Sequence, residues 1–389
     1  MPHRHRTEVT DICPHQEMLH RMKIVKTALC FAAVSAVMVY GCRRLYKADG
    51  DISGAEVAAE TVPPEETVTE VITEPTSDKE LSLTSGKSIT FTFLGDCLLS
   101  SNAGDTRPDA FKAYAEEKPA SYFLEKAVPY YESSDFVVAN NEYVLTDRNL
   151  SKTPKTGTAF WFRSPTSTAD ILKAGGIDIV SIANNHTMDY GTAGYNDTAD
   201  ALDAAGITWG DLDHPVYVEK DGIKFGILCT NMFGTNYEPI ITPKIEDLKE
   251  NSDIQILFFH GGTEKEHVPE DWLVEMCHKY ADMGVDLIVG SHPHVLRPME
   301  SYNGVDIIYS LGNFCYGGSR LPENKTVILT ETFNFDESGS YISQEESFTP
   351  FYVYAGDHNN WQPTPVTDPV EISKTLAFMY GGNDSPVTP

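Results

Sequence analysis

The sequence predicts an α/β fold built around a largely parallel sheet. From residue 85 onward, short apolar runs alternate with amphipathic stretches, which is the order of elements in βαβ units. The apolar runs are continuous rather than alternating, as is typical of strands buried on both faces. Polar residues follow several of these runs directly, so we expect polar side chains to gather where the strands end.

The expected elements follow one another along the chain. Residues 88–94 (SITFTFL) are β-branched and aromatic, which favours a strand, and this strand ends at Gly95-Asp96. Further strands are expected over residues 136–139, 177–183, 224–229, 254–259, 285–289 and 306–309. Helices are expected over residues 168–174, 193–205 and 271–283. A late antiparallel pair is expected over residues 331–335 and 341–354.

The chain is expected to have four segments, of which one is a folded domain. These are a leader (1–47), a linker (48–84), the folded domain (85–380) and a polar tail (381–389). The linker is rich in Glu, Thr and Pro and has almost no aromatic residues. Because such a segment cannot bury enough apolar surface to offset its ordering entropy, we expect a disordered tether.

The leader contains an uncharged apolar run over residues 27–41. It is shorter than the about 20 residues that span a bilayer, so it is closer to the apolar region of a signal peptide. The run ends at Cys42, as in a bacterial lipobox, although Tyr40 is large for its position and Arg43 follows at once. We expect an extracytoplasmic, membrane-anchored protein, either a lipoprotein with Cys42 lipidated or a signal-anchored protein. A plain cleaved signal or a buried helix is the other alternative, and Met22 is a second possible start.

Composition excludes some partners and some kinds of site. The formal net charge is −28, and so acidic a surface repels phosphate backbones, so we expect no nucleic-acid partner. The seven cysteines form no C-x-x-C pair, so neither a zinc knuckle nor a redox motif is indicated. Four cysteines are flanked by apolar residues and are expected to be buried free thiols: Cys97, Cys229, Cys277 and Cys315.

Five polar clusters stand directly after expected strands. They are Asp96; Asn140 with Glu142; Asn185 with His186; His260; and His292 with His294. Carboxylate, amide and imidazole groups that converge at strand ends supply mixed oxygen and nitrogen ligands for a divalent transition metal. A bridging carboxylate with several histidines can hold two ions, which activate water and stabilise a phosphoryl-type transition state.

Each cluster alone has a simpler structural explanation. Asp96 fits a turn, the Asn-His pair fits a helix cap, and His260 fits a core histidine. His292 and His294 are harder to explain, because two imidazoles that flank a proline after an apolar run are costly to desolvate without partners. Since all five clusters stand at strand ends, we favour a metal-type site.

Six blocks of the sequence resemble the CapA family of capsule and poly-γ-glutamate synthesis proteins, a branch of the calcineurin-like metallophosphoesterase superfamily. The blocks, between about residues 88 and 316, are FTFLGDCLLS, ANNEYVLT, SIANNHTMDYG, HGGTE, GVDLIVGSHPHVLRPME and IIYSLGNF. Their order and the spans ANNHTMDYG, GSHPHV and YSLGNF make the resemblance specific. It implies a metallo-dependent phosphatase-like layered α/β sandwich in the folded domain.

The resemblance also implies roles for individual residues, with one or two divalent ions (Mn, Fe or Zn) as the cofactor. The implied metal ligands are Asp96, Glu142 as the bridging acid, Asn185, His260, His292 and His294. His186 takes the place of the catalytic acid or phosphate-orienting imidazole, and Asp189 is placed to orient it. Asn140, Glu264 and Asn313 are expected nearby.

The chain departs from the pattern at three positions. Leu98 stands where the superfamily has a histidine two residues after the first aspartate, which argues against a full second metal site; CapA proteins share this loss. Gly261 replaces the tryptophan usual after the lone histidine, and Lys265 replaces an aromatic residue. We expect a wider pocket or a different substrate.

Two functions from different classes remain open. The first is an enzyme in which metal-activated water or hydroxyl attacks a phosphoester, or an amide or ester of a cell-surface polymer. The second is a non-catalytic accessory subunit that binds or guides capsule polymer at a membrane synthase complex. An unrelated secreted α/β domain is the remaining alternative. The sequence does not identify the substrate.

Overall fold

The computed structural model describes residues 86–317 and 323–381. The expected leader, the linker, Cys42 and nearly all of the polar tail lie outside the described residues. Among the helices that are described, none combines the length and the apolar character needed to cross a bilayer.

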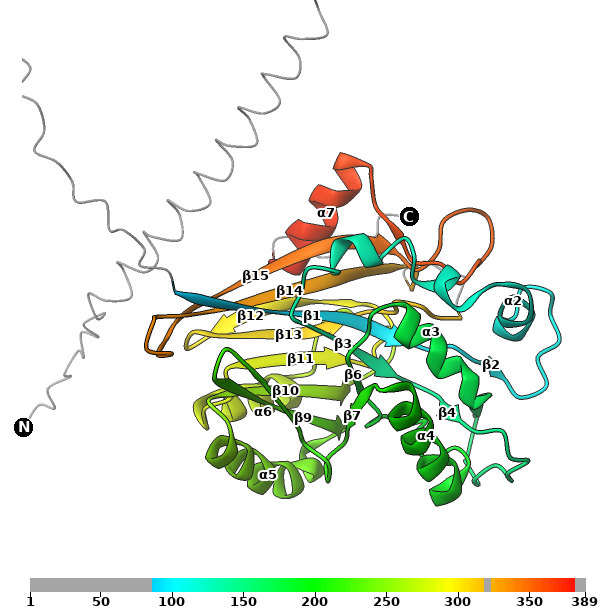
Figure 1. Cartoon of the computed structure of the whole chain (residues 1–389), viewed down its shortest axis with the longest axis horizontal. Helices are drawn as coiled ribbons and strands as arrows, with labels where there is room; N and C mark the ends of the chain where they lie inside the picture. Colours follow the sequence, from blue (N-terminus) through cyan, green and yellow to red (C-terminus); the bar gives the residue numbers. More distant parts are fainter. Residues whose placement is uncertain (1–85, 318–322, 382–389) are drawn as a thin grey trace, which may run out of the picture. The chain divides into compact units, whose positions relative to one another are not determined.

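Two mixed sheets form the centre of the folded domain (Figure 1). In the first sheet, four neighbouring strands are parallel: β1 (Lys87–Cys97), β3 (Phe136–Asn141), β6 (Ile179–Ser181) and β7 (Thr208–Gly210). Antiparallel strands extend it beyond β1: β14 (Lys325–Phe335), β15 (Tyr341–Tyr352) and β16 (Thr364–Pro365).

The second sheet has a parallel centre with antiparallel edges. Its parallel strands are β9 (Ile223–Met232), β10 (Ile254–Gly261), β11 (Leu287–Ser291) and β13 (Val305–Leu311). Its edges are β8 (Val216–Lys220) and β12 (Leu296–Tyr302). A small third sheet joins β2 (Ser101–Asn102), β5 (Phe162–Ser164) and β4 (Val144–Leu145).

The helices pack around the two large sheets, and most of them cover the outer faces. They are α2 (Phe111–Glu117), α3 (Ala169–Ala174), α4 (Gly191–Ala205), α5 (Glu238–Asn251), α6 (Asp271–Asp282) and α7 (Pro369–Met379). On α6, Leu273, Met276 and Tyr280 are buried at helical spacing, which is why this amphipathic segment packs as a helix on its sheet. Short 3-10 turns cover Ala120–Phe123, Val128–Tyr130, Thr166–Thr168 and Thr235–Tyr237.

Three apolar clusters define a layered α/β sandwich. The middle cluster joins residues of both sheets, with Phe91 and Phe93 of β1 in one cluster with Phe258 of β10. A second cluster lies between the first sheet and α3 and α4, and a third lies between the second sheet and α5 and α6. The layers therefore run helix, sheet, sheet, helix, as the layered α/β prediction requires.

The expected elements are present, and the structure adds others. The parallel core is confirmed, but it is divided between two sheets, and β8, β12 and β16 add antiparallel edges that were not expected. Helix α5 was not expected, since Pro243 lies inside it, and α7 and the edge strands were also missed. The late antiparallel pair is confirmed, although β14 begins earlier and β15 ends earlier than expected, and the four expected free thiols are all buried without a disulfide.

Candidate metal centre

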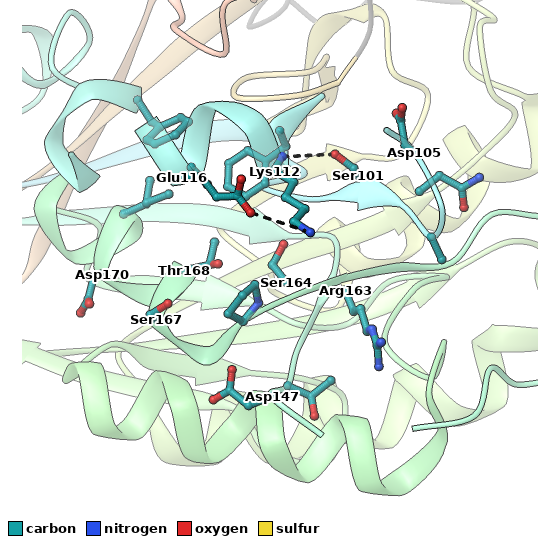
Figure 2. Close-up of a pocket in the computed structure, with 18 of the residues that line it drawn as sticks. Ser101, Asp105, Lys112, Glu116, Asp147, Arg163, Ser164, Ser167, Thr168 and Asp170 are labelled. Atoms are coloured by element: carbon teal, nitrogen blue, oxygen red, sulfur yellow. Dashed lines mark hydrogen bonds and ion pairs between the residues drawn. The ribbon is translucent and has the colours of Figure 1, made fainter. Parts of the chain in front are cut away.

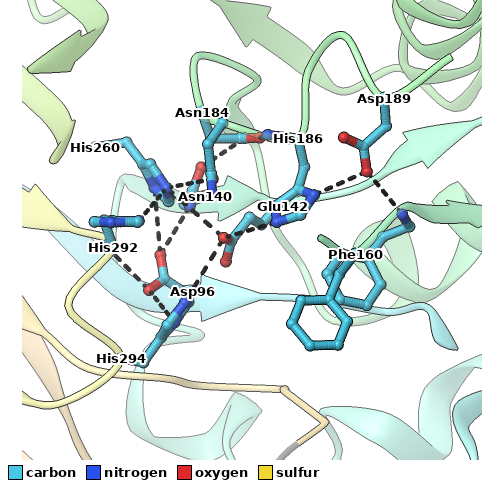
Figure 3. Close-up of polar contacts among 12 residues, drawn as sticks. Asp96, Asn140, Glu142, Phe160, Asn184, His186, Asp189, His260, His292 and His294 are labelled. Carbon is cyan, nitrogen blue, oxygen red and sulfur yellow. Dashed lines mark hydrogen bonds and ion pairs between the residues drawn. The ribbon is translucent and has the colours of Figure 1, made fainter. Parts of the chain in front are cut away.

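The side chains of the polar clusters converge at the strand ends of both large sheets (Figure 3). Asp96 and Asn140 come from the ends of β1 and β3 in the first sheet. His260 comes from β10 of the second sheet, and His292 and His294 follow β11. One site thus draws on both halves of the sandwich.

A bulge in β1 aims Asp96 into this site. Phe93 pairs with Val138 and Asp96 pairs with Asn140, so β1 contains one more residue than β3 between these pairs. The extra residue brings Asp96 beside Asn140, whose Nδ2 donates to Asp96 Oδ1 at 2.8 Å. Gly95 lies in this stretch, where an added Cβ would stand 2.0 Å from the carbonyl oxygen of Gly312. Only glycine permits that approach.

Glu142 is the central residue of the cluster and is called the hub below. Its Oε1 lies 3.7 Å from His260 Nε2 and 4.0 Å from the Nε2 atoms of both His186 and His294. The side chain is fully buried, and neither carboxylate oxygen has a hydrogen-bond partner. A buried carboxylate without partners is costly, so this position calls for a bound cation or proton.

His260 connects the hub to the surrounding polar side chains. Its Nδ1 lies 3.0 Å from Asn140 Nδ2 and 3.1 Å from Ser291 Oγ. Its Nε2 lies 2.9 Å from Asn185 Oδ1 and 3.0 Å from His292 Nδ1. Two imidazole nitrogens and an amide oxygen therefore meet at one point, which is a ligand arrangement for a divalent ion.

His292 and His294 have a backbone conformation that is rare for residues with a side chain. Their φ angles are +99° and +58°, in the left-handed region. Asp96 Oδ2 accepts a hydrogen bond from the backbone N–H of His292 at 3.2 Å, and it lies 3.4 Å from His294 Nδ1. Asn313 Oδ1 lies 2.9 Å from the same Nδ1. Strained backbone held by specific partners is a feature of functional sites.

The electrostatics of the site follow from burial and from close charges. Burial raises the pKa of Glu142 well above 4.5, and lowers the pKa of His260 well below 6.5. Burial and neighbouring His294 lower the pKa of His292 to about 3. Burial opposes protonation of His294 too, but Glu142 and Asp96 outweigh it and raise its pKa to about 9. His260 and His292 are thus neutral at pH 7, the form in which imidazole binds metal.

The residues present fit a divalent metal ion. Glu142, His292 and His294 each offer one ligand atom, and these atoms lie within 4.8 Å of one another. All three side chains are buried, and the donor set of carboxylate oxygen and imidazole nitrogen suits a first-row transition metal. The unpartnered oxygens of Glu142 are the observation that favours an ion over a hydrogen-bonded core cluster.

His186 stands at the side of the hub and is held by Asp189. His186 Nδ1 lies 2.8 Å from Asp189 Oδ2, and its Nε2 faces Glu142. Burial lowers the pKa of His186, although Asp189 opposes this effect. The ring of Phe162 packs edge-on against the imidazole at 4.6 Å between ring centres. An imidazole fixed on one nitrogen and free on the other can transfer a proton.

The structure brings together most of the residues that the sequence pointed to, and whether they bind metal stays a prediction. Asn313 is in contact with His294, whereas Glu264 is exposed and acts on Glu142 and His294 through its charge. Leu98 lies in the apolar cluster under the site. Sequence reasoning missed Asn184, Ser291, Tyr316, Phe162 and Lys155.

Of the missed residues, Asn184 could have been predicted from its sequence motif, whereas Lys155 could not. Asn184 stands beside Asn185 in the block ANNHTMDYG, and its Nδ2 donates to Asn140 Oδ1 at 3.2 Å. Lys155 lies on the connection between β4 and β5, and Phe162 is the first residue of β5; neither belongs to a strand-end motif. Contacts made across such a connection depend on tertiary structure alone.

A separate cleft of about 830 Å³ lies beside the small third sheet (Figure 2). Its lining includes Ser101, Lys112, Asp147, Arg163 and Asp170. None of the candidate metal ligands is among the residues that line it. The cleft and the metal centre are therefore distinct features that share β5.

Two facing sheets with a buried carboxylate-imidazole cluster at their rim define a layered α/β protein with a candidate metal centre. The chain belongs to the family described as bacterial capsule synthesis protein PGA_cap, whose family model matches residues 90–317. This match covers the strands and loops that carry the site.

Three relatives carry names that refer to PGA, capsule or polyglutamine synthesis. The PGA biosynthesis protein CapA of Bacillus subtilis (strain 168) is 30% identical over 249 residues, which cover 58% of this chain and 65% of that protein. The capsule biosynthesis protein CapA of Bacillus anthracis is 25% identical over 313 residues, covering 74% and 71%. A probable polyglutamine synthesis accessory protein of Mycobacterium tuberculosis (strain ATCC 25618 / H37Rv) is 25% identical over 202 residues, covering 42% and 53%. The match thus spans just under two thirds of the Bacillus subtilis protein.

Proposed function

We propose that this chain is a metal-dependent hydrolase or transferase that acts on a phosphoester or polymer linkage during capsule or poly-γ-glutamate synthesis. The observation that carries the proposal is Glu142, which is buried without hydrogen-bond partners and faces three imidazole Nε2 atoms at 3.7 to 4.0 Å. Membership of the capsule synthesis family and the names of the relatives support the pathway.

The residues that would hold a Mn, Fe or Zn ion are Glu142, His292 and His294, with Asp96, Asn185 and His260 beside them. Such an ion supplies Lewis acidity and lowers the pKa of a water molecule. Neutral His260 and His292 offer their lone pairs without prior loss of a proton. Phe233 packs edge-on against His292 at 4.9 Å between ring centres.

His186 would act on the substrate. The carboxylate of Asp189 keeps the proton of His186 on Nδ1, so that Nε2 can take a proton from a nucleophile or return one to a leaving group. Asn185 is exposed while its Oδ1 contacts His260, so its amide group stands at the boundary between site and solvent. This arrangement supports acid-base chemistry on an anionic or amide substrate.

A non-catalytic accessory subunit is the second candidate. It is favoured by Leu98, an apolar core residue at the position where metallophosphoesterases have a histidine, and by the accessory role named for the mycobacterial relative. On this alternative, the site binds an ion for structure, and the domain guides polymer at a membrane synthase complex.

Metal content and turnover of the full-length chain separate the two functions. We expect the purified protein to contain about one Mn, Fe or Zn per chain and to hydrolyse a phosphodiester or γ-glutamyl substrate. His292→Ala should lose both properties, and His267→Ala, a histidine outside the cluster, should keep both. Metal retained without turnover on any of these substrates would support the accessory role. A metal content near zero in the wild type contradicts a metal function of either kind.

We further propose that the protein is anchored outside the cytoplasm, by lipidation of Cys42 or by an uncleaved signal anchor. The apolar run 27–41 supports this location, and it lies outside the described residues. Labelling with palmitate that is lost in Cys42→Ser would support the lipoprotein. An unlabelled chain of full length in the membrane fraction would support the signal anchor, and a chain recovered only from the cytosol would contradict both.

A further inference from the structure

The connection between β4 and β5 is unusually basic for this chain. Residues 148–163, here called the basic segment, contain Arg148, Lys152, Lys155 and Arg163 and no acidic residue. The whole chain has 29 basic and 57 acidic residues, so the segment runs against the general charge. Its last two residues belong to β5, where the ring of Phe162 packs on His186.

Lys155 brings one of these charges to the side of the metal centre, where it meets Asp189. Its Nζ forms an ion pair with Asp189 Oδ1, donates to the carbonyl oxygen of Phe160 at 2.9 Å and lies 3.4 Å from His186 Nδ1. Asp189 is fully buried, whereas the side chain of Lys155 is 25% exposed. Burying the carboxylate of Asp189 without a cation would be costly, and Lys155 is the cation that meets it.

The hydrogen bonds at Asp189 determine which nitrogen of His186 carries the proton. Asp189 Oδ2 accepts the backbone N–H of Phe162 at 2.8 Å and lies 2.8 Å from His186 Nδ1. A carboxylate can only accept, so Nδ1 must donate. Nε2 is then left with its lone pair toward Glu142. The contacts therefore run from Lys155 to Asp189, from Asp189 to His186, and from His186 to Glu142.

We propose that Lys155 is a positioning residue of this site: its ammonium group holds Asp189 as the acceptor that fixes the His186 ring with the proton on Nδ1 and the lone pair toward Glu142. The inference deepens the proposed function, because it adds a residue to the same site. Lys155 acts through Asp189 and does not itself need to touch substrate.

Hydrogen bonds that do not involve Lys155 also hold the basic segment against Asp189. Substitution of Lys155 can therefore be tested without releasing the segment. Thr153 N–H donates to the carbonyl oxygen of Asp189 at 2.9 Å, and Trp161 Nε1 donates to the carbonyl oxygen of Thr153 at 2.8 Å. Lys152 lies over the ring of Trp161 at 4.8 Å and forms no ion pair among the described residues. It is therefore a matched control, a lysine of the same segment with no contact to the dyad.

The first test reads the His186 ring directly and needs no turnover. In full-length protein with 15N-labelled histidine, we expect wild-type His186 to show one tautomer with Nδ1 protonated, assigned by its loss in His186→Asn. Lys155→Met should move the two ring-nitrogen shifts toward each other, Lys155→Arg should restore them, and Lys152→Met should leave them unchanged. Wild-type shifts in folded Lys155→Met would overturn the proposal. Asp189→Asn should give the same change by another route, so an unchanged ring there also overturns it.

The second test separates positioning from substrate binding and rests on the proposed function. Lys155→Met should lower kcat about 10- to 100-fold with little change in KM, as expected when an outer partner of a functional histidine is lost. Lys155→Arg should recover most of the rate, and Lys152→Met should match the wild type. A rise in KM with unchanged kcat would overturn the positioning role. If the wild type shows no turnover, the proposed function fails, and the ring-nitrogen measurement still decides the role of Lys155.

Discussion

At the scale of single residues, two buried glutamates show how surroundings separate a functional position from a structural one. Glu142 and Glu331 are both fully buried, and neither has a hydrogen-bond partner for its carboxylate oxygens. Glu142 faces imidazoles that can share an ion with it. Glu331 lies on β14, where burial and the negative charges of Asp306 and Glu346 disfavour its ionised form. The ionised carboxyl group of Glu331 is therefore unfavourable in the core.

We predict that Glu331→Met stabilises the protein at pH 7 by about 1–3 kcal/mol, the usual cost of an unsatisfied buried polar group. Burial, with Asp306 and Glu346, raises the folded-state pKa of Glu331 well above its unfolded value of 4.5. Wild-type stability is therefore complete below pH 4.5 and falls as the pH rises toward the folded-state pKa. Urea unfolding should show the advantage of the variant shrinking toward pH 4. The exposed Glu345→Gln is the control, and an equal gap at both pH values contradicts the prediction.

The backbone at His292 gives a second prediction. Because its φ is +99°, glycine should suit this position better than alanine. Both variants lose the imidazole, so their difference isolates the backbone. We expect His292→Gly to be about 1 kcal/mol more stable than His292→Ala in metal-free urea unfolding. At His267, where φ is not positive, alanine should be the more stable of the two, and the same order at both positions would refute the strain.

At the scale of elements, one buried arginine fixes the loop that borders the metal centre. Arg297 on β12 is fully buried and donates to Glu270 and to the carbonyl oxygens of Thr263 and Glu266. These contacts tie β12 to the loop between β10 and α6, which carries Glu264. The Arg297 side chain therefore helps to hold that loop in place through one ion pair and two hydrogen bonds to backbone carbonyls.

We predict that Glu270→Gln destabilises the protein by about 3 kcal/mol at pH 7, because it leaves the buried guanidinium without its counter-charge. Burial opposes ionisation of Glu270, but hydrogen bonds from Arg297 and Thr263 lower its pKa from 4.5 to about 2. This contribution is present above pH 4.5 and is lost as the pH falls through 2. Chemical unfolding should show wild type and variant converging over that range. The exposed neighbour change Asp271→Asn should track the wild type throughout, and parallel curves for Glu270→Gln would contradict the assignment.

The elements also show what sequence reasoning can reach. The strand of β1 and the amphipathic α6 were predicted because their residue patterns are local and strong. The bulge that aims Asp96 depends on the register with β3, and the contact of Lys155 depends on a long connection, so neither has a local pattern. Helix α5 was missed because Pro243 argues against a helix when tertiary packing is not known. The candidate ligands were predicted together because parallel strands bring their carboxyl ends to one edge of a sheet.

At the scale of the whole molecule, the candidate ligands come from both sheets. Asp96 and Glu142 belong to the first sheet and the loop after it, and His260, His292 and His294 belong to the second. A ligand that bridges them links the two halves of the sandwich across the middle apolar cluster. Binding at this site is therefore coupled to global unfolding.

We predict that Mn or Zn at 100 times its Kd raises the free energy of unfolding by about 2.7 kcal/mol, because the ion binds only the folded state. A chelator should reverse the gain. His294→Ala should lose most of it, whereas His278→Ala, on the outer helix α6, should keep it. Thermal unfolding with and without metal measures both. An equal gain in the wild type and in His294→Ala would place the binding elsewhere.

The four buried thiols have a practical consequence. Burial raises the pKa of Cys97 and Cys229 to about 12, so neither is a nucleophile while the core is closed. Cys97 follows Asp96 directly, and the carbonyl oxygen of Cys315 accepts the N–H of Leu98 at 2.9 Å beneath the site. An alkylating reagent can reach the buried sulfurs of Cys97 and Cys315, which share one apolar cluster, only when that part of the core opens. The rate at which these thiols are labelled therefore measures how often the core opens.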